Sequence, residues 1–207
     1  NPDVLVHCDC VQGFGKILFS LNRIKADMVT MSSHKIHGPK GSGAIYVREG
    51  VNVRPLCFGG SQESKVRPGT ENVPGIAAFG HASLKALRDI RENWEHVKEL
   101  NLYLTDCLRQ MEDVVINSPS GAVPYVLNIS VLPFATEELL HEMRMRGIYL
   151  SGSSACEKGA RSHVIRAMGI EGPRADSVVR IGLGKKNTRE EVTVLVETLN
   201  ELIKRGK

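Results

Sequence analysis

A short block of reactive and small residues, 32–41, follows a run of apolar residues and carries the lysine best suited to chemistry. The run 27–31 predicts a strand, and Ser32, His34 and Lys35 come directly after it. Partial burial favours the neutral, nucleophilic form of an amine, so Lys35 is a candidate for Schiff-base formation. Ser32 and His34 can hold a phosphate beside it. On composition alone, a solvated lysine in a loop remains the alternative.

A second polar group, Asp9 and Gln12, follows another predicted strand whose apolar run is 4–6. A carboxylate at this position can pair with a pyridinium nitrogen and keep it protonated, which makes the ring an electron sink. The Gln12 carboxamide can donate to a ring oxygen. The alternative is that Asp9 caps the element that follows.

Cys156 lies in a stretch of small residues, 151–159, between a predicted strand at 148–150 and a predicted helix at 164–168. Such a loop can carry a thiolate onto a bound substrate. The alternative is a small core residue, which is the commonest environment of a free cysteine.

Arg180 interrupts the predicted apolar strand 178–184. An arginine inside a strand is costly unless it is paired. Its partner is either a structural carboxylate or the carboxylate of a ligand, which a guanidinium binds bidentately.

The elements that must position these residues alternate between strands and helices, which indicates an α/β fold. Further strands are expected at 43–47 and 125–132, and 50–72 is expected to be a binding loop. Apolar residues at helical spacing over 74–112 exceed the length of an ordinary helix, so we expect a bend or break there. Thr136 is expected to be the N-cap of one helix, and Thr188 with Glu191 forms a capping box for the last one.

Composition limits the classes of protein that fit. The 207 residues are 42% hydrophobic and 24% charged with a net charge of +4, which is typical of a soluble globular protein. No segment is apolar enough to span a membrane, no signal peptide is recognisable, and the scattered positive charge does not indicate nucleic-acid binding. Five widely spaced cysteines indicate a reducing, cytoplasmic compartment, and His7, Cys8 and Cys10 match no common zinc spacing, so no metal site is expected.

Taken together, these motifs resemble the cysteine desulfurases, which belong to the class V aminotransferase family of fold-type I pyridoxal phosphate enzymes. The matching residues occur in order along nearly the whole chain: His7-x-Asp9-x-x-Gln12, Ser32-x-His34-Lys35-x-x-Gly38-Pro39-Lys40-Gly41, Arg67-x-Gly69-Thr70, Ser154-Ala155-Cys156 and Arg180-x-Gly182-x-Gly184. The chain begins just before the strand of Asp9, so it resembles the carboxyl-terminal half of such an enzyme. We therefore expect the isolated chain to bind the cofactor weakly or not at all and to be inactive.

The resemblance implies roles for some residues of these motifs. Lys35 would link pyridoxal phosphate covalently, with His34 beside it, and Cys156 would accept the sulfur as a persulfide while L-cysteine becomes L-alanine. The residues expected to bind the cofactor are Asp9, Gln12, Ser32, His34, Lys35 and Thr70, with Thr70 reaching the cofactor of a partner subunit in a homodimer. Arg180 would bind the substrate carboxylate.

The implied organisation is part of a large cofactor-binding domain over 1–75, a long linking helix over 76–113 and a small α+β domain over 114–207. The expected partners are L-cysteine and a sulfur-acceptor protein such as an iron–sulfur scaffold. The alternatives are a selenocysteine lyase, another class V aminotransferase, or a non-catalytic interaction module. A transaminase would not need Cys156.

Overall fold

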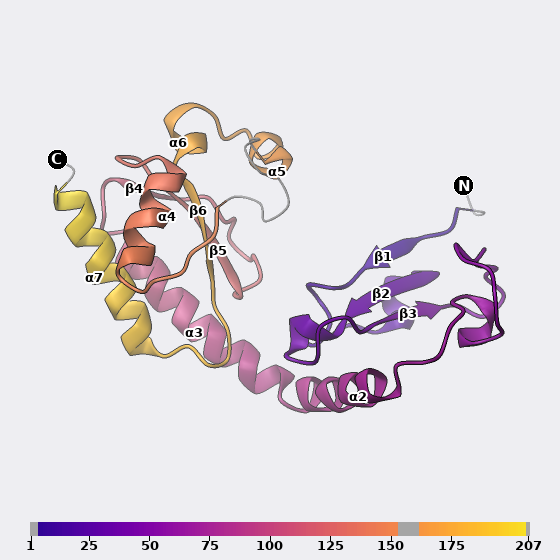
Figure 1. Ribbon diagram of the computed structural model, residues 1–207. Coiled ribbons are helices and arrows are strands. Elements are labelled where there is room, and N and C mark those ends of the chain that lie inside the picture. The colour runs from indigo at the N-terminus through magenta and orange to yellow at the C-terminus, as the bar shows by residue number, and fades with distance from the viewer. Residues whose placement is uncertain (1–3, 153–161, 206–207) are drawn as a thin grey trace. The chain divides into compact units, whose positions relative to one another are not determined.

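The computed structural model describes residues 4–152 and 162–205 and has the mixed α/β architecture that the sequence predicts (Figure 1). The chain divides into two compact units, residues 1–92 and 93–207. The finer division at residues 75 and 113 stays a prediction.

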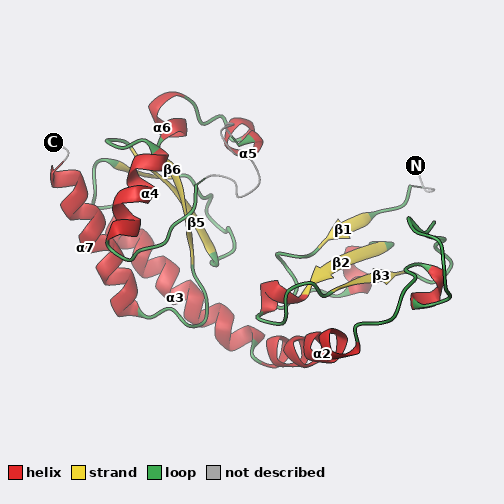
Figure 2. Cartoon of the chain, viewed as in Figure 1, coloured by secondary structure: helices red, strands yellow, loops and turns green. Residues whose placement is uncertain are grey.

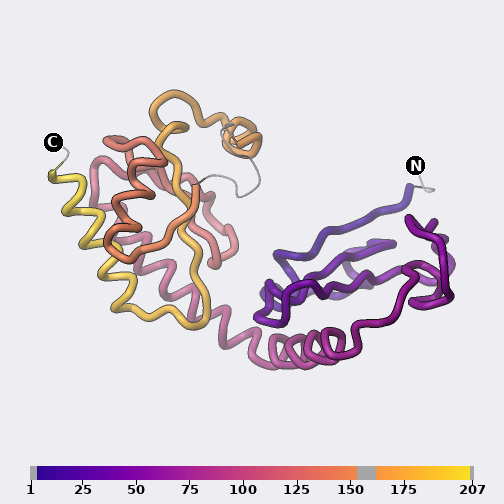
Figure 3. Tube along the Cα trace, in the orientation of Figure 1, coloured from indigo at the N-terminus to yellow at the C-terminus, as the bar shows by residue number. Residues whose placement is uncertain are grey.

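The first unit is built on a three-stranded sheet in the order β1-β2-β3, formed by β1 (His7–Asp9), β2 (Met28–Ser32) and β3 (Gly43–Val47). β1 and β2 are parallel, so the chain between them must cross over, and it does so through the short helix α1 (Leu21–Ile24); Figure 3 traces this path. β3 returns antiparallel to β2. Because β1 and β2 are parallel, Asp9 and Ser32 both lie at the carboxyl edge of the sheet.

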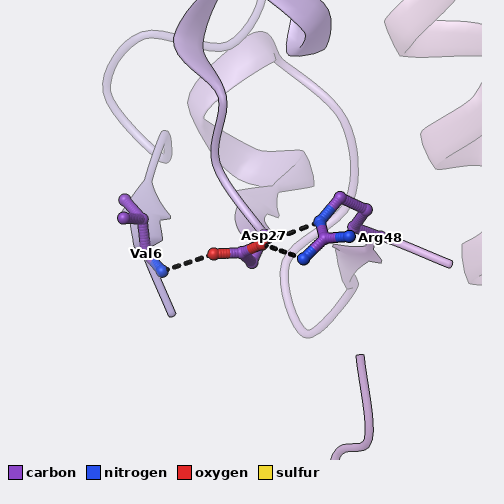
Figure 4. Close-up of polar contacts among 3 residues, drawn as sticks. All are labelled: Val6, Asp27 and Arg48. Atoms are coloured by element: carbon purple, nitrogen blue, oxygen red, sulfur yellow. Dashed lines mark hydrogen bonds and ion pairs between the residues drawn. The ribbon is translucent and has the colours of Figure 1, made fainter. Parts of the chain in front are cut away.

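At the opposite end of these strands, the buried carboxylate of Asp27 binds two other segments of the unit (Figure 4). Its Oδ2 accepts a hydrogen bond from the backbone N of Val6 at 2.7 Å, and its Oδ1 accepts one from Nε of Arg48 at 2.7 Å. The backbone hydrogen bond from Val6, and then the bond from Arg48, hold the pKa of Asp27 below its usual value. Asp27 therefore joins the chain before β1 to the chain after β3.

Helix α2 (Val73–Arg88) covers one face of the sheet. The Asn72 side chain caps it by accepting a hydrogen bond from the backbone N of Gly75 at 3.2 Å. On the side facing the sheet, Phe79 packs edge-on against Phe14 with ring centroids 6.1 Å apart. The buried cluster between α2 and the Lys35 region is small, and its members are Ile36, Phe79 and Ala86. The other buried apolar residues among the described residues of this unit are Ala26, Val29 and Ile90.

The second unit has an antiparallel sheet in the order β4-β5-β6. Helices accompany this sheet (Figure 2), and its buried core is much larger than that of the first unit. Apolar side chains of three helices, α3, α4 and α7, share this core with the sheet. The elements are α3 (Ile90–Leu108), β4 (Val114–Ile116), β5 (Val126–Val131), α4 (Thr136–Met145), α5 (His163–Ala167), α6 (Gly172–Asp176), β6 (Val178–Gly182) and α7 (Arg189–Arg205).

The capping box that opens α7 is confirmed, since the Thr188 hydroxyl accepts from the backbone N of Glu191 and the Glu191 carboxylate accepts from that of Thr188. The helical stretch after residue 73 is interrupted at Asp89, between α2 and α3, as its length predicts.

Two local predictions are wrong. Thr136 is the first residue of α4 rather than its N-cap, which is Ala135, because the Thr136 hydroxyl donates instead to the backbone carbonyls of Asp176 and Val178. Residues 148–150 form no strand, and only Ser151 makes an isolated bridge to Arg180. Among the described residues, no helix combines the length and the apolar character needed to cross a membrane.

Candidate functional site

Lys35 lies in a tight turn at the carboxyl end of β2. Ser33–Ile36 form a single 3₁₀ turn, η1, in which Lys35 is half-buried. The turn ends at His37, whose φ of 66° is left-handed, and Gly38 closes it by donating its backbone N–H to the Ser33 carbonyl at 3.0 Å. Ile36 anchors the turn in the core beneath α2. The backbone that carries Lys35 is therefore held from both sides.

Gly38 is required by the close approach of this turn to α2. A Cβ at position 38 would overlap the buried Ser33 hydroxyl and lie 3.2 Å from Cβ of Ala82. A residue without a side chain is thus what lets the Lys35 turn dock against the helix.

Ser32 and His34 are brought together beside Lys35. The Ser32 Oγ and the His34 Nδ1 lie 2.7 Å apart in a hydrogen bond, and His34 is exposed. This bond occupies Nδ1, so Nε2 is the imidazole nitrogen left for another partner among the described contacts.

Asp9 and Gln12 lie at the same edge of the sheet as this turn. Asp9 pairs with Thr30 in the register of β1 and β2, which places it one strand over and two residues before Ser32 on the same face. Its Oδ1 accepts a hydrogen bond from the backbone N of Val11 at 2.9 Å, and the carboxylate is exposed. Gln12 follows in the turn after β1 and is also exposed.

Lys16 is a charged residue at this edge that the motifs do not include. Its Nζ donates to Oε1 of Gln12 at 3.2 Å. Burial, together with the positive charge of Lys35, lowers the pKa of Lys16. The available signal in the sequence is its spacing, four residues after Gln12 and directly after Gly15.

Arg180 lies on β6 in the second unit and is half-buried. Its Nη2 donates to the Ser151 hydroxyl at 3.3 Å, and the backbones of the two residues exchange hydrogen bonds. No ion pair within residues 4–152 and 162–205 involves Arg180. The sequence leaves two alternatives for the partner of Arg180, a structural carboxylate or the carboxylate of a ligand. No carboxylate of the described residues fills the structural role.

The remaining candidate residues are Thr70 and the cysteines. Thr70 is exposed in the long loop after β3. Cys156 lies outside the described residues. Cys8 and Cys10 have Sγ atoms 3.5 Å apart, and burial raises the pKa of Cys10 to about 11. In the described part of the chain, no three His, Cys, Asp or Glu side chains gather into a metal site.

Comparison with known protein families identifies the family of this chain. A family model described as aminotransferase class-V matches residues 1–195. The chain belongs to the class V aminotransferases. Enzymes of this family depend on pyridoxal phosphate in general. The resemblance found in the motifs is thereby confirmed.

The individual relatives include curated cysteine desulfurases and solved structures. The mitosomal cysteine desulfurase of Encephalitozoon cuniculi (strain GB-M1) is 36% identical over 207 residues, covering 98% of this chain and 48% of the relative. A solved structure described as a NifS-like protein matches with a TM-score of 0.90 and 36% identity, over 99% of this chain and 53% of that one. The structure of SspA in complex with cysteine matches with a TM-score of 0.71 and 27% identity, over 90% and 52%. The chain thus spans about half the length of the relatives it matches.

Proposed function

We propose that this chain supplies the lysine, the sulfur-accepting cysteine and the substrate-binding arginine of a pyridoxal phosphate-dependent cysteine desulfurase. The observation that carries the proposal is the edge of the first sheet. There the half-buried Lys35 follows the hydrogen-bonded Ser32 and His34, and the parallel strand β1 ends in Asp9 beside them. The cysteine desulfurases among the relatives support the same activity.

The donors at this edge fit pyridoxal phosphate by their chemistry. Lys35 offers an amine for the aldehyde, Ser32 and His34 offer donors for phosphate, and Asp9 offers a carboxylate for the ring nitrogen. When bound, the cofactor supplies a protonated ring that accepts the electron pair left at the substrate's Cα. Asp9 keeps the proton on the ring nitrogen, and Lys35 Nζ moves the proton taken from Cα.

Arg180 binds the carboxylate of L-cysteine in this proposal. Its guanidinium contacts the Ser151 hydroxyl but forms no ion pair with a described carboxylate, so a ligand carboxylate would give it the bidentate partner it lacks. The complex of SspA with cysteine supports an amino acid of this kind as substrate.

The sulfur step uses the Cys156 thiolate. It attacks Sγ of the substrate, so that an S–S bond forms while the Cβ–Sγ bond breaks. The electrons of the broken bond remain on Cβ, which takes up a proton and becomes the methyl group of L-alanine. The sulfur is oxidised to a persulfide as the carbon is reduced, so the step needs no outside oxidant or reductant. A sulfur-acceptor protein, such as an iron–sulfur scaffold, then removes the sulfur.

The assembly and compartment follow from the same proposal. Thr70, exposed on its loop, would contact the cofactor of a second subunit in a homodimer. Cys8, Cys10, Cys57 and Cys107 are free thiols, which suits a reducing compartment such as the cytoplasm.

The test separates a desulfurase from a transaminase. In the full-length protein loaded with pyridoxal phosphate, Cys156→Ser is expected to keep the visible absorption of the bound cofactor, because neither cofactor nor substrate binding uses this sulfur. It should slow alanine release from cysteine by at least about a hundredfold, since the nucleophile is gone. Alanine and sulfide are measured, and the mass of the Cys156 peptide reports the persulfide.

Two controls make the outcome specific. Cys57→Ser changes an exposed thiol and should retain turnover, whereas Lys35→Ala should lose the covalently bound cofactor. Unchanged desulfuration by Cys156→Ser would reject the sulfur-accepting role, and cofactor trapped by borohydride on another lysine would reject Lys35.

A further inference from the structure

The side chains of Lys16 and Gln12 form a contact that determines how the Gln12 amide is oriented. The Lys16 ammonium lies 3.2 Å from Oε1 of Gln12. An ammonium has three donors and no acceptor, so it can pair only with the oxygen of the amide. The end of Gln12 that remains for another partner is therefore its NH₂ group, which is a donor.

The backbone holds Lys16 in place for this contact. Gly15 has a φ of 70°, and a Cβ there would lie 2.6 Å from Cγ2 of Ile36, the residue after Lys35. Position 15 thus requires glycine, and the turn after β1 lies against the Lys35 turn. The positive charge of Lys35 acts on Lys16 across this contact.

We propose that Lys16 is a positioning residue that fixes the Gln12 carboxamide with its NH₂ group available to donate to the ring oxygen of pyridoxal phosphate. This inference rests on the proposed function. Without Lys16, the amide is free to turn its oxygen toward the ring oxygen, and two acceptors then face each other. Lys16 acts through Gln12 and need not touch the cofactor.

The experiment compares cofactor binding in single and double variants of the full-length protein. Lys16→Met is expected to raise the dissociation constant of pyridoxal phosphate about tenfold, the usual worth of a hydrogen bond to a charged group. It should also shift the visible absorption maximum of the bound cofactor, because the donor to the ring oxygen is no longer fixed. Lys16→Arg, which keeps a cationic donor, should restore both values.

A double-mutant comparison shows whether Lys16 affects cofactor binding through Gln12. Gln12→Leu should weaken binding by itself, and adding Lys16→Met to it should change little further, since the residue through which Lys16 acts is already gone. Lys40→Met, an exposed lysine in the following turn, is the matched control and should behave like wild type.

The outcomes separate this inference from the proposed function. If wild type carries no borohydride-trapped cofactor on Lys35, the proposed function itself fails. If wild type does, but Lys16→Met binds and absorbs like wild type, only the role of Lys16 is overturned. An equal loss in the Gln12→Leu background also overturns it, because Lys16 then acts independently. Should Lys16→Met lower the thermal stability, Lys16→Ala, which also lacks a side-chain donor, carries the same comparison.

Discussion

Asp27 holds three segments of the first unit with one carboxylate, and its charge makes this contact depend on pH. The pKa of Asp27 is lowered in the folded protein by the Val6 backbone N–H and by Arg48. Its stabilising effect is therefore present above the ordinary pKa of an aspartate, about 3.9, and is lost as the pH falls through the lower folded value.

Asp27→Asn should accordingly lower the thermal midpoint at pH 7, and the gap from wild type should narrow as the pH is brought toward 3. Thermal unfolding across this pH range measures the gap. Asp106→Asn removes an exposed carboxylate whose partner is Arg109 and should change little at any pH, because exposed ion pairs contribute little. A gap for Asp27→Asn that stays constant with pH would show that its charge is not what stabilises the fold.

Also at the scale of single residues, the sequence predicts which motif residues lie close together better than it predicts the contacts of the residues around them. Lys35, His34 and Ser32 are adjacent in the chain, so their proximity follows from one short turn. The contact of Lys16 with Gln12 depends on a left-handed Gly15 and on Ile36 packing against it, and neither is visible in a motif. The roles of all the motif residues stay predictions.

The turn that carries Lys35 docks on α2 only because position 38 has no side chain, and this gives a prediction at the scale of the element. Gly38→Ala should destabilise the protein by about 1–3 kcal/mol, since the added methyl overpacks the space beside Ser33 and Ala82. Denaturant unfolding measures the change. Borohydride trapping on Lys35 should weaken with it, because the turn must shift.

Two variants distinguish overpacking from a general intolerance of substitution. Gly80→Ala, on α2 with open space around it, should instead stabilise by about 0.5–1 kcal/mol. Ser33→Ala combined with Gly38→Ala should recover part of the loss, because the Ser33 hydroxyl is the nearest atom and has no hydrogen-bond partner among the described residues. A loss in the double variant as large as in Gly38→Ala would contradict the overpacking.

Elements with a strong local signal were predictable, and those decided by distant contacts were not. The strand Gly43–Val47 and the capping box of α7 follow from neighbouring residues. Thr136 looks like an N-cap, yet its hydroxyl is taken by carbonyls from residues 176 and 178, which no local pattern reveals. Residues 148–150 have the composition of a strand, but pairing with β6 begins only at Ser151.

At the scale of the whole molecule, the two units differ in how much apolar surface they bury. Among the described residues, the main buried core cluster of the second unit has 19 members, whereas the cluster that supports the Lys35 turn has three. Apolar side chains before β1 are exposed as well, with Val4 at 61% and Leu5 at 54%. Since burial of apolar surface is the main stabilising term, the first unit should open more readily than the second.

Hydrogen exchange followed by mass spectrometry checks this difference directly. In the 207-residue chain, amides of β5 and α7 should exchange at least about tenfold more slowly than those of β1 and β2, because the larger core must open before they exchange. Adding pyridoxal phosphate to the full-length protein should slow exchange in β1 and β2 more than in β5, since a ligand stabilises the part of the structure that it binds. Equal exchange in both units before addition would mean that they open together, and the small core around Ile36 would then not limit the stability of the site.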